Sequence, residues 1–128
     1  MNIPLTIAGA IMVLTTGVHV FAGGPEYHDV YQTVLPTAHL ASMAAVLWHV
    51  ITINLIVFAG AYFWLAQHSS RPLMIALAAM QIGWIGLFLF YGTTMLGSLW
   101  PMPQWVIFSA TVLLTIYGAR QRDVALAT

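Results

Sequence analysis

The chain has 128 residues, of which 61% are hydrophobic and only 5% are charged. A soluble domain of average composition is about a quarter charged, so this chain has too few charges to cover a water-facing surface. Disordered chains are polar and rich in charge, so that class is excluded as well. The formal net charge is zero, and the chain therefore lacks the basic patch that nucleic-acid binding needs. The absence of cysteine excludes disulfides and thiolate metal ligands.

Four apolar runs separated by polar connections follow one another along the chain. A membrane-spanning helix needs roughly 20 apolar residues, so this length allows about four crossings and no separate soluble domain. We expect spans at about residues 3–22, 36–66, 73–96 and 105–119. The second run exceeds the thickness of a bilayer, so we expect it to tilt or protrude. The sequence therefore predicts one all-α transmembrane domain over residues 1–128, folded as a four-helix bundle in the lipid bilayer.

The first run is expected to end at Gly23-Gly24-Pro25, because two glycines followed by a proline do not sustain a helix. Residues 26–34 then form a polar connection, with Thr33 as a cap and Pro36 in the first turn of the second helix. The residues Val20-Phe21-Ala22 resemble a signal-peptidase site. No basic residue precedes the run, as a signal peptide normally requires, so we expect the first span to be retained.

The basic residues predict the orientation of the chain. Arg71, Arg120 and Arg122 lie in the second connection and the C-terminal tail, which four spans place on the same side of the membrane. Basic residues close to span ends stay on the cytoplasmic side. We therefore expect a multi-pass protein of the inner membrane with both termini in the cytoplasm and residues 23–34 and 98–104 outside.

Stripes of small residues predict which helix faces pack together, because helices in lipid associate through close packing and polar contacts. The stripe on the second run includes His49, which we expect to point inward, together with Ala38, Ala41, Ala45, Thr52 and Gly60; Leu40, Leu47, Ile51 and Phe58 occupy the opposite side. Similar stripes on the third and fourth runs consist of Ala76, Ala79, Gly83, Gly86 and of Thr111, Thr115, Gly118, Ala119.

Gln81 is an exception to this pattern. It lies about 160° around its helix from Gly83, away from the small residues. A polar group left in hydrocarbon costs several kcal/mol. The position of Gln81 therefore predicts either a second buried face or a contact with another chain.

Five histidines are the most unusual feature of so uncharged a chain, and four of them lie within the first 49 residues. Imidazole and carboxylate are ligands of zinc, copper and non-haem iron, and two facing imidazoles can hold a haem iron. We expect a transition-metal or haem site near the outer face, with His19 and His49 as the cofactor-binding pair and with His19, Glu26, His39 and His49 as metal ligands. His28, Asp29 and His68 are expected to be solvated residues of connections.

Other functions remain open at this stage. The chain contains neither HExxH nor HxxxH, and an intramembrane histidine also serves as an interhelical hydrogen-bond donor; Thr15 and Thr16 are local partners for His19. An accessory or structural subunit of a larger membrane complex is one alternative. A proton-coupled transporter based on histidine is another, since imidazole titrates near neutral pH. The expected partners are the bilayer and either a second copy or a larger membrane protein, and whether the chain is an enzyme stays undecided.

The stretch from His19 to Glu26, followed by Leu47-Trp48-His49, resembles small uncharacterised bacterial four-span membrane proteins. In those proteins a His–Gly-Gly–Glu stretch ends the first span and a Trp-His pair lies in the second. The resemblance covers about the first 55 residues. It implies a bacterial inner membrane and a joint role for His19, Glu26 and His49, and it implies no established activity.

Overall fold

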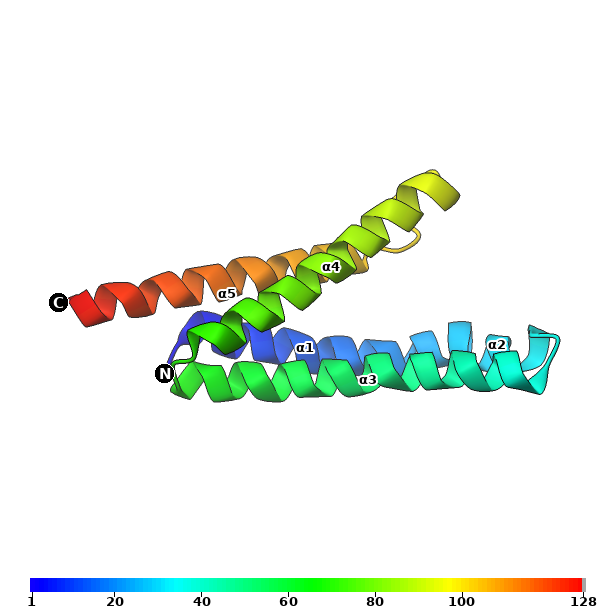
Figure 1. The fold of residues 1–128 in the computed structure, drawn as a ribbon, viewed down its shortest axis with the longest axis horizontal. Helices are drawn as coiled ribbons and strands as arrows, with labels where there is room; N and C mark the ends of the chain where they lie inside the picture. The colour runs from blue at the N-terminus through cyan, green and yellow to red at the C-terminus, as the bar shows by residue number, and fades with distance from the viewer. Residues whose placement is uncertain (128) are drawn as a thin grey trace. The chain divides into compact units, whose positions relative to one another are not determined.

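The computed structural model describes the backbone of residues 1–127 and the side chains of residues 1–121 (Figure 1). The side chains of Arg122 and Asp123 lie outside the described set. Within residues 1–127 there is no strand, and the helices are α1 (Ile3–Phe21), the π-helix η1 (Gly24–His28), α2 (Asp29–Val34), α3 (Ala38–Gln67), α4 (Arg71–Met95) and α5 (Gln104–Ala127). The prediction of an all-α chain is confirmed.

Three helical segments are long and apolar enough to cross a membrane, and they indicate a membrane protein. They are Ile3–Val34, Ala38–Gln67 and Arg71–Met95. The helix α5 has 24 residues and continues well past the expected end at residue 119. The expected fourth run lies within α5, and the helix continues because the polar tail after Ala119 consists largely of arginine, glutamine, alanine and leucine, which favour helix.

The first helical segment does not end at Gly23-Gly24-Pro25, as the sequence had suggested. Pro25 lies in the first turn of η1, where a missing N–H is tolerated, and the backbone N–H of Asp29 donates to the carbonyl oxygen of Gly24, five residues earlier. This wider turn carries the chain into α2, which continues in the direction of α1 (Figure 1). The expected connection over residues 26–34 is therefore helical.

The turn to the next helix lies at residues 35–37 instead. Thr37 rather than Thr33 caps α3, since its hydroxyl oxygen accepts the backbone N–H of Leu40 at 3.2 Å. Thr33 donates its hydroxyl to the carbonyl of Val30 in its own helix. Pro36 precedes α3 and is not in its first turn. Neither Thr33 nor Pro36 therefore has the role predicted for it at the start of the second helix.

The chain divides into two compact units, each described here by itself. The hairpin unit, Gly9–Ala61, contains most of α1, the segments η1 and α2, and most of α3. The C-terminal unit combines Met1–Ala8 with the chain from Tyr62 onward. A single four-helix bundle would require these two units to pack together in one particular way, so the bundle stays a prediction.

A network of polar side chains lies in the core of the C-terminal unit. Gln81 on α4 is fully buried, and its side-chain amide donates to the Tyr62 hydroxyl at 2.6 Å. Its amide oxygen accepts the hydroxyl of Thr111 on α5. The Tyr62 hydroxyl in turn bonds with that of Thr115 at 2.9 Å. Gln81 therefore lies on the buried face of α4, and its partners come from within the chain.

The buried face of α4 differs from the predicted one. Ala76, Ala79, Gly83 and Gly86 are exposed in the described chain, whereas the buried residues of α4 are Met74, Leu77, Gln81 and Gly92. The stripe prediction for the third run was wrong, because the packing side is the one that carries the Gln81 amide and the larger apolar side chains. On α5 the prediction is confirmed, since Thr111, Thr115 and Gly118 are buried.

On α3 the stripe prediction holds only in part. Ala41, Ala45 and Thr52 are half-buried, but Ala38, His49 and Gly60 are exposed. Phe58, from the side expected to face lipid, is 2% exposed. The inward orientation expected for His49 was therefore wrong.

The start of the chain is fixed to the C-terminal unit by Asn2. Its backbone N–H donates to the carbonyl of Ala66, and its side-chain amide donates to the carbonyl of Gly118, both at 2.8 Å. A Cβ atom on Gly118 would lie 2.8 Å from Oδ1 of Asn2 and 2.9 Å from Cγ of Leu5. Glycine thus permits a close approach of α5 to residues 2–5.

The polar network predicts that Tyr62→Phe destabilises the protein. The substitution keeps the ring but removes the hydroxyl that joins Gln81 to Thr115, and interhelical hydrogen bonds in membranes contribute about 1–2 kcal/mol. We expect a loss of that size in unfolding by dodecyl sulfate in mixed micelles. Tyr91→Phe is the matched control, because Tyr91 is exposed on α4. Equal stability of the two variants would contradict the role given to the network.

The close approach at Gly118 predicts opposite effects for two glycine substitutions. Gly→Ala in a helix normally stabilises by up to about 1 kcal/mol, and Gly86→Ala should follow this rule because no atom lies within 4 Å of its Cβ position. Gly118→Ala should instead cost about 1–3 kcal/mol through overpacking. The same unfolding assay compares them, and a Gly118→Ala protein as stable as the parent would count against the packing described.

Candidate functional site

The hairpin unit brings together three of the four histidines in the first 49 residues. His19 lies near the end of α1, His28 is the last residue of η1, and His49 is on α3. Trp48 is the common neighbour, since its ring lies 3.9 Å from that of His19 and 5.9 Å from that of His28, measured between centroids. His28 and His49 have ring centroids 5.4 Å apart. A cluster of imidazoles around one indole therefore joins the two arms of the hairpin.

His19 acts as a hydrogen-bond donor between the two arms. Thr52 donates its own hydroxyl to the carbonyl of Trp48 at 3.1 Å, so its oxygen accepts from Nε2 of His19 at 3.1 Å. Nε2 also lies 3.4 Å from the Trp48 carbonyl oxygen. Thr15 and Thr16, the expected local partners, donate to carbonyls of their own helix. The ring of His19 is therefore fixed by α3, and Nε2 is not a free ligand.

His28 is oriented by the residue that follows it. Its Nδ1 lies 3.0 Å from Oδ1 of Asp29, and its side chain is 23% exposed against 69% for Asp29. A carboxylate on one ring nitrogen fixes the tautomer and directs the other nitrogen outward, as at the histidines that bind metals. The π-turn accounts for this position, because it places His28 on a helical segment next to α3. Such turns are frequent at functional sites.

The remaining predicted ligands, Glu26 and His39, are not part of the cluster around Trp48. Glu26 and His39 are exposed, and among the described residues no group of three or more His, Cys, Asp or Glu side chains is arranged to hold a metal ion. His68, at the end of α3 in the C-terminal unit, stacks on Trp64 with centroids 4.6 Å apart and bonds to its carbonyl. The cluster thus contains His49 and His19 from the predicted set, together with His28, which the sequence had assigned to a solvated connection.

The His28–His49 pair has a spacing that suits one shared metal ion. With metal–nitrogen bonds of about 2.0–2.1 Å and a tetrahedral angle, two imidazoles on one zinc ion have ring centres roughly 5 Å apart. The observed 5.4 Å is close to that value. Two imidazoles on opposite sides of a haem iron would be roughly 6.4 Å apart with the porphyrin between them. The separation of the two rings is thus nearer to the value for a small ion than to the value for a haem.

No protein-family model, curated protein or solved structure matches the chain.

The packing around Trp48 predicts different effects for two neighbouring glycines. A Cβ atom on Gly23 would lie 2.9 Å from the Trp48 ring, whereas no atom lies within 4 Å of that position on Gly24. Gly23→Ala should displace the indole from His19, lower stability by about 1–3 kcal/mol and change the near-ultraviolet circular dichroism. Gly24→Ala should leave that spectrum unchanged. Identical spectra for all three proteins would contradict this arrangement.

Proposed function

We propose that the chain is a four-span protein of the inner membrane that binds a divalent transition-metal ion at the outer end of its first hairpin. The three apolar helical segments support the membrane setting, and α5, with its apolar part at about residues 105–119, supplies the fourth crossing. Arg71 is the first residue of α4, and Arg120 directly follows the apolar part of α5; the positive-inside rule favours the cytoplasm for both. The hairpin end that carries His28 then faces outside.

The observation that carries the metal proposal is the His28–His49 pair with Asp29 behind it. Two imidazoles converge to 5.4 Å, and the carboxylate of Asp29 holds Nδ1 of His28. A carboxylate in this position raises the basicity of the imidazole and fixes its direction. Imidazole ligands suit zinc, copper and nickel, and copper binds most tightly in the usual order of divalent ions.

A two-imidazole site leaves coordination positions for water or for further donors. The sequence suggests two additional ligands, Glu26 on η1 and His39 in the first turn of α3. Their exposed side chains would have to rearrange to reach an ion held by His28 and His49. His19 would first have to release Thr52. We therefore place His28 and His49 as the primary ligands, in a protein that binds or passes on a metal ion.

The proposal predicts that His28→Ala and His49→Ala each weaken metal binding at least tenfold. The measurement is a calorimetric titration of the detergent-purified protein with Zn²⁺ or Cu²⁺ alone, in which the parent chain should bind one ion. Asp29→Ala should weaken binding about 10–100-fold through loss of the supporting carboxylate. His68→Ala is the control, since it removes an imidazole outside the hairpin unit.

The pH dependence supplies a second readout of the same site. Imidazoles must be neutral to bind a metal, so affinity should fall as the solution is made more acidic. A parent protein that takes up no ion would overturn the proposal, and so would an equal loss in the His68→Ala control.

A further inference from the structure

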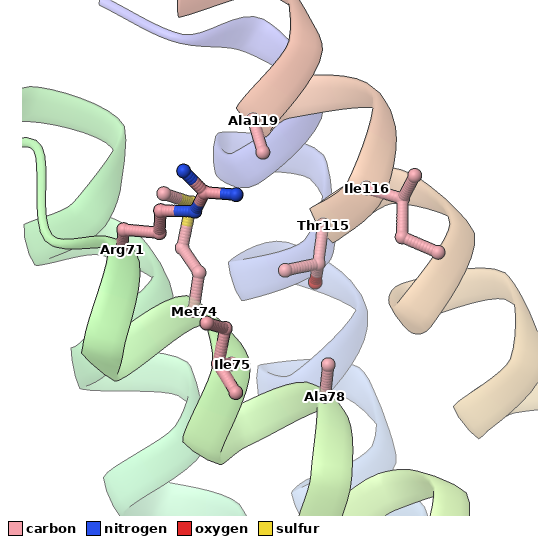
Figure 2. A pocket seen from close by; sticks show the side chains of 7 residues that line it. All are labelled: Arg71, Met74, Ile75, Ala78, Thr115, Ile116 and Ala119. Atoms are coloured by element: carbon pink, nitrogen blue, oxygen red, sulfur yellow. The ribbon is translucent and has the colours of Figure 1, made fainter.

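A pocket between α4 and α5 lies within the C-terminal unit and has no role in the proposed metal site. Its volume is about 140 Å³, and Figure 2 shows its lining side chains, Arg71, Met74, Ile75, Ala78, Thr115, Ile116 and Ala119. Apart from Arg71 and Thr115 these are apolar. An apolar cavity of about 150 Å³ in another protein holds a benzene molecule. The pocket therefore has room for several methylene groups.

The one charged side chain of the pocket lies at its edge. Arg71 is the first residue of α4, and its guanidinium extends over Met74 beside the apolar lining (Figure 2). Among the described side chains the only ion pair is His28–Asp29 in the hairpin unit. The acidic residues of the sequence are Glu26, Asp29 and Asp123, and none with a described side chain belongs to this unit. Among the described side chains, Arg71 therefore has no acidic partner.

The polar atom inside the pocket is already engaged. The Thr115 hydroxyl donates to the carbonyl of Thr111 and bonds with Tyr62. Recognition inside the pocket therefore depends on apolar contact, and polar recognition depends on Arg71. A ligand that matches both has an apolar tail and an anionic head.

We propose that this pocket binds an anionic glycerophospholipid, with part of one acyl chain between α4 and α5 and the phosphate on Arg71. Guanidinium groups bind phosphate through paired hydrogen bonds. The inference rests on the membrane insertion proposed above, which places Arg71 on the cytoplasmic side, where anionic headgroups are recognised by basic pockets between helices. It does not depend on the metal site.

The test compares lipids and variants by native mass spectrometry of the full chain released from detergent. Three separate samples contain dioleoylphosphatidylglycerol, dioleoylphosphatidylcholine and glycerol 3-phosphate. The last carries the phosphate group but no acyl chain. We expect one phosphatidylglycerol per chain, retained at least tenfold better than phosphatidylcholine, and no retained glycerol 3-phosphate.

Two matched pairs of variants locate the site. Arg71→Gln should lower phosphatidylglycerol retention at least fivefold, whereas Arg120→Gln, which removes the same charge outside the pocket, should change it less than twofold. Ala78→Leu fills the pocket and should lower retention of both lipids, whereas Ala79→Leu changes an exposed position on the same helix and should not. Unchanged elution in detergent and unchanged helical circular dichroism verify folding.

The inference would be overturned by an Arg71→Gln protein that retains the lipid as the parent does, by equal losses for the two arginine variants, or by equal effects of the two alanine variants. Retention of glycerol 3-phosphate alone would do the same. Metal titration of Arg71→Gln separates the two proposals, because it should match the parent. A protein that needs no detergent would instead remove the membrane setting on which both proposals rest.

Discussion

Polar side chains on apolar helices need partners within the protein, and this requirement organises the C-terminal unit. In hydrocarbon no water is present to satisfy them. The side-chain amide of Gln81 satisfies this requirement by donating to the Tyr62 hydroxyl and accepting from the Thr111 hydroxyl. The Tyr62 hydroxyl also bonds with that of Thr115. Each side-chain oxygen and nitrogen in this series therefore has a hydrogen-bond partner within the protein. The packing face of α4 is therefore the side that carries one amide, and the stripe of small residues lies elsewhere.

The π-turn at Gly24–His28 has a comparable effect on the hairpin unit. A chain that ended its first helix at Gly23 would leave His28 and Asp29 in a solvated connection. The wider turn keeps them helical and places His28 beside His49. It follows that the proposed ligands come from the two arms of one hairpin, with Trp48 packed between the imidazoles of His19 and His28. The ligand that we propose for this unit is a cation, whereas the one that we propose for Arg71 in the other unit is anionic.

Length and hydropathy were enough to predict the long helices. The expected runs 36–66 and 73–96 agree closely with α3 and α4, Ala38–Gln67 and Arg71–Met95. The π-turn could not be predicted, because it depends on a backbone bond between Asp29 and Gly24 and not on the helix propensity of either. The members of the histidine cluster were predicted only in part for the same reason. His49 was identified, but His28 was assigned to a connection, and the partner of His19 proved to be Thr52 on the other arm.

The proposed membrane setting requires the exposed apolar surface of the helices to face lipid. Ile56 on α3 is 56% exposed, and Ser69 in the following turn is exposed as well. The chain has no cysteine, so Ile56→Cys and Ser69→Cys each carry a single thiol. In membranes from cells that produce the protein, a water-soluble maleimide should label Ser69→Cys and leave Ile56→Cys unlabelled until dodecyl sulfate is added. Equal labelling of both thiols before the detergent would contradict the account.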